Sequence, residues 1–167
     1  MAVTYDPIAT TTLGTATNTI TFSSIAASWT DLRVTINTIF SVATAELYLQ
    51  YNGNTANNYS NLGLFGQGVG AGGTSSQNNN PQIRVISIGS SSNTLPTFAT
   101  IDIFSYAGST NKTCLMTESM DKNGSGTTGV GVGLWRSTAA ITSIRLFTST
   151  GNFGVGTTLT LYGIKAA

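Results

Sequence analysis

GVGVGLWRSTAAITSIRLFTSTGNFGVGTTLTLYGI, residues 129–164, decides the fold class of this chain. The segment consists of strand-type runs separated by turns rich in glycine, serine and asparagine, and it contains no stretch with helical periodicity. It holds no histidine and no acidic residue, so it offers no usual catalytic acid or base. The pattern is typical of the closing strands of a β-sandwich whose role is to present a rigid surface.

The strand pattern continues through the rest of the chain. Residues 31–40 and 46–51 alternate between apolar and polar side chains, and Asn52-Gly53 then gives a strong tight-turn signal. Residues 97–106, TFATIDIFSY, are apolar on both faces, which predicts a central strand. Short strands at a spacing of about ten residues favour a sandwich or jelly roll over a parallel α/β sheet. We therefore predict an all-β fold: a single antiparallel β-sandwich, jelly-roll-like, with nine or ten short strands.

Two segments differ from this pattern. Residues 1–16 are polar and threonine-rich, and they predict an extended N-terminal arm, which leaves residues 17–167 as one β-sandwich domain. Residues 66–81, GQGVGAGGTSSQNNNP, are rich in glycine and lack large apolar anchors, so they predict a flexible loop. A chain of 167 residues can form a core without disulfides or metal, and its single cysteine, Cys114, is expected to be a buried hydrophobe.

Composition limits the classes of partner. Only 8% of the residues are charged and the net charge is +1, while polarity comes from 29 threonines, 18 serines and 14 asparagines. The four arginines are scattered through separate strands, so no basic stripe predicts nucleic-acid binding. No apolar run approaches the length of a membrane span, and no N-terminal signal peptide is recognisable. A neutral surface suits a subunit fixed in an assembly better than a free monomer.

The ionisable residues predict no active site. Histidine is absent, which removes the usual general base and the commonest metal ligand. Asp102 is the one candidate for a buried carboxylate, and we expect it to pair with Arg145 or Arg84. Two matches to G-x-G-x-x-G, at residues 68–73 and 124–129, do not open a helix and are attributed to glycine-rich turns. We expect no catalytic residue, no cofactor and no metal, and we do not predict an enzyme.

The last feature of the sequence is a resemblance that spans nearly the whole chain. It is carried by YDPIATTTLGTAT (5–17), ITFSSIAASWTDLRV (20–34), YNGNTANNYS (51–60), VGLWRSTAAITSIRL (132–146), TGNF (150–153) and TLTLYGIKAA (158–167). Together these segments resemble a family of small bacteriophage virion proteins that is frequent in phages of aquatic bacteria, cyanophages among them. The resemblance implies a virion component, assembled in the cytoplasm of the host bacterium.

The resemblance and the single β domain together favour a capsid cement, or decoration, protein. Such a protein is expected to form a homotrimer on the capsid surface and to bind the major capsid protein. In that case the N-terminal arm is the candidate anchor, through Val3, Tyr5, Pro7 and Ile8.

The alternative is a receptor-binding module of a tail or head fibre that recognises host surface glycans. Exposed aromatic side chains would stack on the sugars, and the candidate glycan or partner contacts are Tyr59, Asn61, Gln67 and Asn79. A glycan-degrading enzyme is a third hypothesis, and the dispersal of the six carboxylates argues against it.

Overall fold

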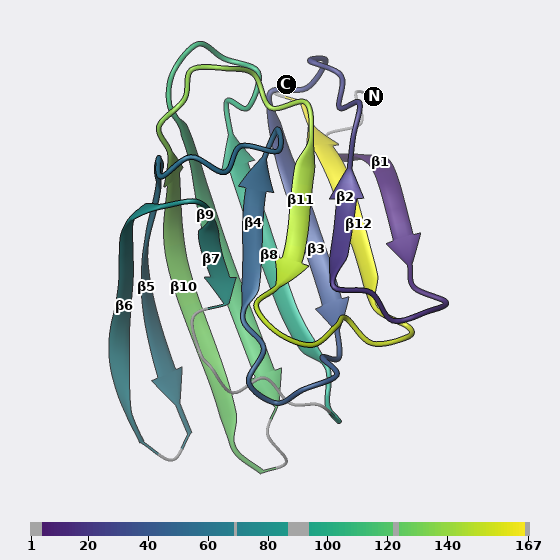
Figure 1. Ribbon diagram of the computed structural model, residues 1–167, viewed down its shortest axis with the longest axis vertical. Helices are drawn as coiled ribbons and strands as arrows, with labels where there is room; N and C mark the ends of the chain where they lie inside the picture. The colour runs from purple at the N-terminus through teal and green to yellow at the C-terminus, as the bar shows by residue number, and fades with distance from the viewer. Residues whose placement is uncertain (1–4, 69, 87–93, 122–123, 166–167) are drawn as a thin grey trace.

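Antiparallel strand pairing organises the whole computed structural model, which describes residues 5–68, 70–86, 94–121 and 124–165 (Figure 1). The larger sheet has eight strands, in the spatial order β1 (Tyr5–Thr12), β12 (Thr158–Ile164), β3 (Asp31–Thr38), β8 (Thr97–Phe104), β9 (Lys112–Asp121), β10 (Gly126–Trp135), β5 (Tyr59–Gln67) and β6 (Gly70–Asn80). The smaller sheet has four strands, in the order β2 (Thr19–Phe22), β11 (Ile144–Thr148), β4 (Leu47–Tyr51) and β7 (Ile83–Ile86). The described residues contain no helix.

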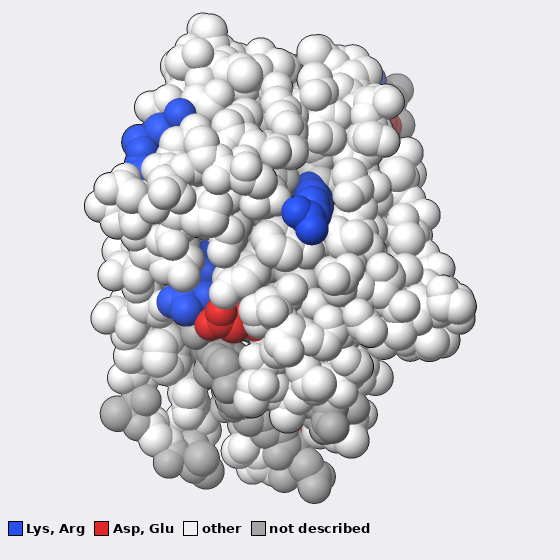
Figure 2. Space-filling model, viewed as in Figure 1, with Lys and Arg blue, Asp and Glu red and all other residues white. Residues whose placement is uncertain are grey.

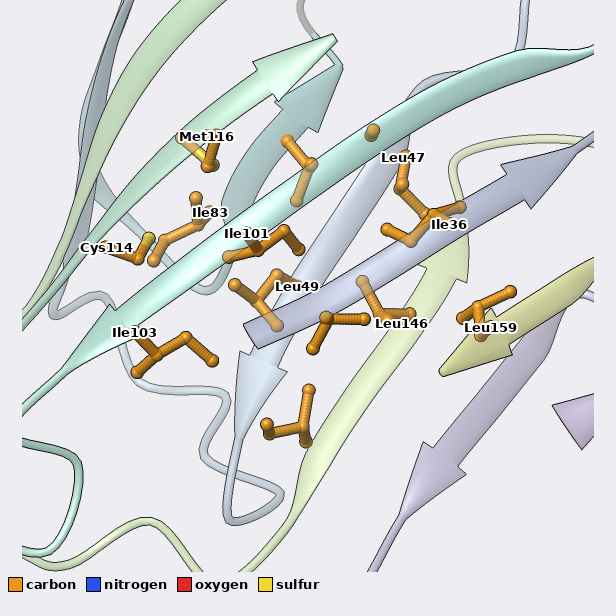
Figure 3. Packing of buried hydrophobic residues seen from close by; sticks show 14 of the residues in the cluster. Ile36, Leu47, Leu49, Ile83, Ile101, Ile103, Cys114, Met116, Leu146 and Leu159 are labelled. Atoms are coloured by element: carbon orange, nitrogen blue, oxygen red, sulfur yellow. The ribbon is translucent and has the colours of Figure 1, made fainter. Parts of the chain in front are cut away.

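The two sheets pack face to face and enclose the core. Strand β3 alternates in burial along its length, and the completely buried Leu32 and Val34 point inward. Leu49 and Leu146 of the smaller sheet are likewise completely buried and point into the same space (Figure 3). Burying each such side chain contributes about 1.5–3 kcal/mol, so this alternation holds the two layers together. The predicted all-β antiparallel sandwich is confirmed.

The structure has twelve strands in its described part rather than nine or ten, and the difference lies at the edges of the larger sheet. Residues 5–12, expected as part of an extended arm, form the edge strand β1 and pair with β12 from Tyr5↔Ile164 to Thr12↔Thr158. Ile8 packs partly against the core. The β-branched threonines of both strands favour this pairing, and the side chains of Thr10 and Thr160 meet at an oxygen–oxygen distance of 3.1 Å. Val3 lies outside the described residues.

The glycine-rich segment that was expected to be a flexible loop forms most of a hairpin. Strand β6 covers residues 70–80 and pairs with β5 from Gly70↔Gln67 to Asn80↔Tyr59. The glycines permit a close approach, because a Cβ at Gly73 would lie 2.7 Å from the ring of Phe65. An edge strand needs no large apolar anchors of its own, since its neighbour supplies the hydrogen-bond ladder.

Three aromatic side chains fill the end of the core beside β5. Tyr51, Tyr59 and Trp135 are at most 2% exposed, and their ring centroids lie 5.5–6.3 Å apart. Burial raises the pKa of Tyr59 to about 12. Burial also raises the pKa of the neighbouring Cys114 thiol to about 11 and thus suppresses its reactive thiolate form. Cys114 is 2% exposed, as expected for a buried hydrophobe.

Candidate functional site

Three carboxylates of the described residues, those of Asp6, Glu46 and Asp102, form ion pairs in separate places. Asp102, expected to be the buried carboxylate, is half-buried, and the buried one is Glu118 at 7% exposure. Asp102 accepts two hydrogen bonds from Arg33, with Nε–Oδ1 at 2.5 Å and Nη2–Oδ2 at 2.8 Å. The prediction that Asp102 pairs with Arg84 or Arg145 is therefore wrong. Arg33 faces Asp102 directly across the β3–β8 ladder, and the sequence alone could not place these two strands side by side. Among the described residues no group of three or more histidine, cysteine, aspartate or glutamate side chains could hold a metal ion.

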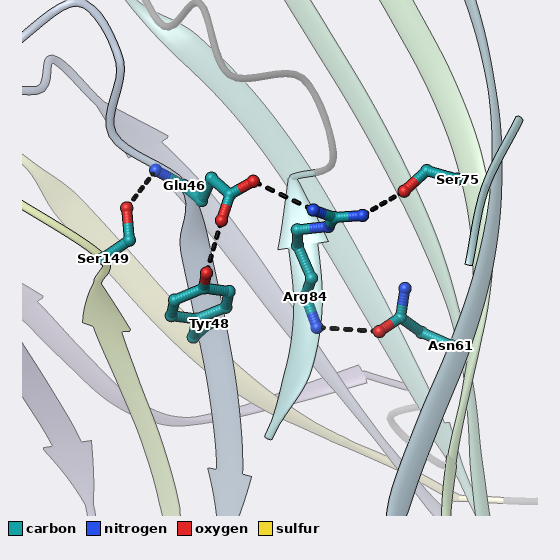
Figure 4. A network of polar contacts seen from close by, with 6 residues as sticks. All are labelled: Glu46, Tyr48, Asn61, Ser75, Arg84 and Ser149. Atoms are coloured by element: carbon teal, nitrogen blue, oxygen red, sulfur yellow. Dashed lines mark hydrogen bonds and ion pairs between the residues drawn. The ribbon is translucent and has the colours of Figure 1, made fainter. Parts of the chain in front are cut away.

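Arg84 instead joins a polar network that ties the smaller sheet to β6 (Figure 4). Its Nη1 lies 3.0 Å from Oε1 of Glu46, and its Nη2 donates to the hydroxyl of Ser75 on β6. The backbone N–H of Arg84 donates to Oδ1 of Asn61 over 3.2 Å. Burial and a hydrogen bond to Glu46 raise the pKa of Tyr48 to about 12. Because Arg84 neutralises Glu46, the network has the character of a structural clamp.

The structure places the four candidate glycan contacts on two strands, and they do not form one exposed loop. Tyr59 is completely buried, and its hydroxyl accepts a hydrogen bond from the backbone N–H of Tyr51 over 3.1 Å. Tyr59 is therefore a core residue and cannot stack on a sugar, which corrects that expectation. Asn61 is also buried, at 6% exposure, and holds the backbone of Arg84.

The other two candidates reach the surface. Gln67 is half-buried at the end of β5. Asn79 on β6 is exposed, and its Oδ1 accepts a hydrogen bond from Nη2 of Arg136 over 2.7 Å. Of the candidate anchors, Tyr5 and Pro7 are exposed on the edge strand β1, where Ile8 is half-buried.

The most distinctive surface is the outer face of the larger sheet, which points away from the smaller sheet. Four neighbouring strands expose large apolar side chains there, each 36–54% accessible, and we call this set the apolar patch: Leu62 and Leu64 on β5, Val130 and Val132 on β10, Leu115 on β9 and Phe104 on β8. They adjoin one another, because Val132 lies opposite both Leu62 and Leu115, and Val130 lies opposite Leu64. A shallow groove of about 480 Å³ runs between Leu62, Leu115 and Phe104.

The glycines of β10 explain why its valines face outward. Gly129, Gly131 and Gly133 point into the sandwich, and at each a Cβ would come within 3.3 Å of at least two side-chain or backbone atoms. At Gly129, for example, it would lie 2.7 Å from the carboxylate of Glu118. Steric crowding therefore fixes the phase of the strand, and the alternation of side chains then exposes both valines.

The surroundings of the apolar patch are neutral and hydroxylated. A row of threonines crosses five adjacent strands in register, and we call it the threonine row: Thr10, Thr160, Thr35, Thr100 and Thr117. The row continues into the patch because Thr117 lies opposite Val130. The nearest ion pair on this face, Arg33 with Asp102, is internally neutralised. Figure 2 shows the opposite side of the molecule, where the smaller sheet lies in front; charged side chains are few there too, and the acidic group in view lies against a basic one.

A second, larger groove lies at one end of the same sheet. It has a volume of about 820 Å³ and is lined by Gln67 from β5, by Phe98 and Ser119 from β8 and β9, and by Asp121 and Thr128 among others. Phe98 is 50% exposed. The groove therefore combines an accessible aromatic ring with side chains that can form hydrogen bonds.

Sequence reasoning missed the outer face as a candidate site, although two signals were available. Residues 97–104 are apolar on both faces, and in the segment GVGVG the valines alternate with glycines. Where alternate residues of a strand are glycines, the larger side chains between them all lie on one face.

No helix of the described residues is long and apolar enough to cross a membrane. Comparisons with models of known protein families, with curated proteins and with solved structures found no match.

Proposed function

We propose that this chain is a structural protein of a bacteriophage virion, acting as a capsid cement protein that binds the outer surface of the major capsid shell. The resemblance of residues 5–17, 20–34 and 132–146 to small virion proteins supports the phage assignment. The observation that carries the mechanism is the apolar patch on an otherwise neutral sheet face. In this proposal the patch is the surface that contacts neighbouring virion proteins.

Docking through such a face has a favourable free energy for two reasons. Burying each half-exposed leucine or valine of the patch contributes about 1 kcal/mol. The neutral surroundings avoid the large cost of removing unpaired charges from water. A rigid two-layer core limits the conformational entropy lost on binding. This lowers the cost of binding to neighbouring capsid subunits. Tyr5 and Pro7 are exposed on the edge strand β1, and in this proposal they form a second contact, separated from the patch by β12 and β3.

Replacing Val132 by lysine is expected to weaken binding to capsids about tenfold or more, because it places an ammonium group in the apolar contact. The measurement is co-sedimentation of the purified chain with heads of its phage that lack this protein, followed by DNA release on heating. Val155→Lys is the matched control, since Val155 is a 65% exposed valine outside the apolar patch. Equal binding and equal head stability with both variants would reject the proposal.

The groove beside Phe98 supports a second candidate function, a receptor-binding module for host surface glycans. The exposed ring of Phe98 offers a stacking surface, and Gln67, Ser119 and Thr128 line the same groove with hydrogen-bonding groups. This arrangement is the one that sugar binding requires: an apolar platform with a few polar groups around it.

Under this second function, Phe98→Ala is expected to reduce binding to host polysaccharide about tenfold, since a stacked aromatic ring dominates such contacts. Phe104→Ala is the control, because Phe104 is similarly exposed on the same strand but does not line this groove. Calorimetric titration with purified polysaccharide measures the difference. Absence of binding by the unmodified chain would dismiss the glycan function.

A further inference from the structure

The two sheets have four edges, and three of them carry features that hinder pairing with another chain. Strand β2 is only four residues long, and β7 spans four residues in the described part of the chain. Strand β1 contains Pro7, and its register shifts between Pro7 and Ala9. Short strands, prolines and irregular registers are the usual protections of sheet edges.

The fourth edge, β6, has a regular central stretch: its register against β5 is unbroken from Gly73↔Phe65 to Asn78↔Ser60 and shifts only on either side of it. It runs for eleven residues, Gly70–Asn80, without a charged residue or a proline. No described strand lies on the side of β6 that faces away from β5 (Figure 1). Alternate residues of an edge strand direct their N–H and C=O groups outward, so β6 presents a row of hydrogen-bonding groups that another strand can satisfy.

Side-chain hydrogen bonds from neighbouring residues hold this edge in place. Arg84 donates to the hydroxyl of Ser75, and Arg136 donates to Oδ1 of Asn79 over 2.7 Å. Ser60 on β5 donates to Oδ1 of Asn78 over 2.8 Å. Little further ordering of the strand is therefore needed when a partner binds, which lowers the entropic cost of association.

The sequence of β6 is complementary to itself when two copies run antiparallel. Its first half, residues 70–73, is made of glycine and alanine, whereas residues 77–80 are glutamine and asparagine. In an antiparallel pair centred on Ser75, the regular central stretch places Gly73 of one copy opposite Gln77 of the other, and Thr74 opposite Ser76. We propose that β6 is a dimerisation edge, at which two copies of this chain join their larger sheets through an antiparallel β6–β6 ladder.

The two-fold axis of such a pair is perpendicular to the sheet, so both outer faces lie on the same side. Strand β5, which carries Leu62 and Leu64, is the direct neighbour of β6. The two apolar patches therefore lie on one face of the dimer, separated by the paired β6 strands. An isologous contact of this kind closes after two copies, whereas pairing β6 with β1 would be heterologous and could continue into a filament. The resemblance to cement proteins led us to expect a trimer, whereas this proposal predicts a dimer.

This inference does not depend on the phage assignment, because its test uses the purified full-length chain alone. Sedimentation equilibrium at micromolar concentration is expected to give a particle of twice the 17.3 kDa monomer mass. A monomer or a trimer under these conditions would overturn the proposal, and neither result would bear on capsid binding by the apolar patch.

Charge substitutions on β6 test both the edge and the register. Thr74→Lys/Ser76→Lys places like charges opposite each other twice in the antiparallel pair and is expected to raise the dissociation constant of the dimer about tenfold or more. Thr74→Lys/Ser76→Glu places opposite charges at the same positions and is expected to restore dimerisation. Thr10→Lys/Thr12→Lys is the matched control, because it adds two lysines to exposed threonines of the other edge of the sheet.

Thermal unfolding of each variant shows whether the fold is retained, and all four exposed positions are expected to tolerate the change. A dimer that persists in Thr74→Lys/Ser76→Lys would show that another surface pairs and would overturn the proposal. Failure of the charge-swapped variant to dimerise, with its fold intact, would overturn the antiparallel register centred on Ser75.

Discussion

Replacing Gly133 by valine is expected to lower the free energy of unfolding by about 3 kcal/mol, the upper part of the usual range for overpacked cores. A Cβ at this position would lie 2.7 Å from Sγ of Cys114 and 2.9 Å from Cδ1 of Ile83. Neither neighbour can move into solvent, since Cys114 is 2% exposed and Ile83 is completely buried. Urea denaturation followed by tryptophan fluorescence measures the change.

Two comparisons isolate the steric cause. Gly66→Val is the control, because Gly66 lies on the adjacent strand β5 and a Cβ there would meet no atom within 4 Å, so its effect should stay within about 0.5 kcal/mol. Gly133→Ala should be better tolerated when Cys114→Ala removes the nearest sulfur, which a double-mutant cycle detects as a favourable coupling. If Gly133→Val were as stable as Gly66→Val, the inward packing of β10 described above would be wrong.

Replacing Tyr59 by alanine is expected to cost about 3–5 kcal/mol of stability, as for other large aromatic side chains deleted from a core. The Tyr59 ring stacks on Trp135 with a centroid distance of 6.0 Å and an interplanar angle of 13°. Its hydroxyl donates toward the carbonyl oxygens of Tyr51 and Asn54, at 3.3 and 3.2 Å. Alanine would leave a cavity and remove the partner of a buried backbone N–H.

Tyr5→Ala is the control for this second substitution. Tyr5 is 44% exposed on the edge strand β1, where its ring lies 5.4 Å from the guanidinium carbon of Arg33. Deleting an exposed ring with one cation–π contact should cost about 1 kcal/mol or less. Equal destabilisation by both substitutions would contradict the burial of Tyr59. If Tyr59→Ala lost polysaccharide binding but kept its stability, Tyr59 would be a surface glycan contact, as the sequence predicted.

The sandwich core and the neutral outer face serve one physical purpose in the proposed function. The core makes the larger sheet rigid, and the glycines of β10 direct Val130 and Val132 outward. The surface that results has few charges to desolvate and little flexibility to lose. These are the properties of a face that binds another protein surface, and they require no reacting group.

Local patterns in the sequence predicted the elements whose two faces differ strongly. In residues 31–38 and 47–51, apolar and polar side chains alternate because one face of each strand meets the core and the other meets its surroundings. The structure confirms strands at both places. The prediction that Tyr59 and Asn61 are exposed glycan contacts is wrong, because both are buried. A tyrosine or an asparagine is compatible with either face of a strand, so the sequence could not place them.

Composition and periodicity by themselves determined that this chain is an antiparallel sandwich with an almost uncharged surface, because side-chain alternation and turn residues act over a few positions. Only the tertiary structure decided that Asp102 pairs with Arg33, that residues 5–12 and 70–80 become edge strands, and that the valines of β10 face outward. Each of these depends on which strand lies beside which, and on the space that remains between them. Those are contacts between residues far apart in the chain, which no local pattern specifies.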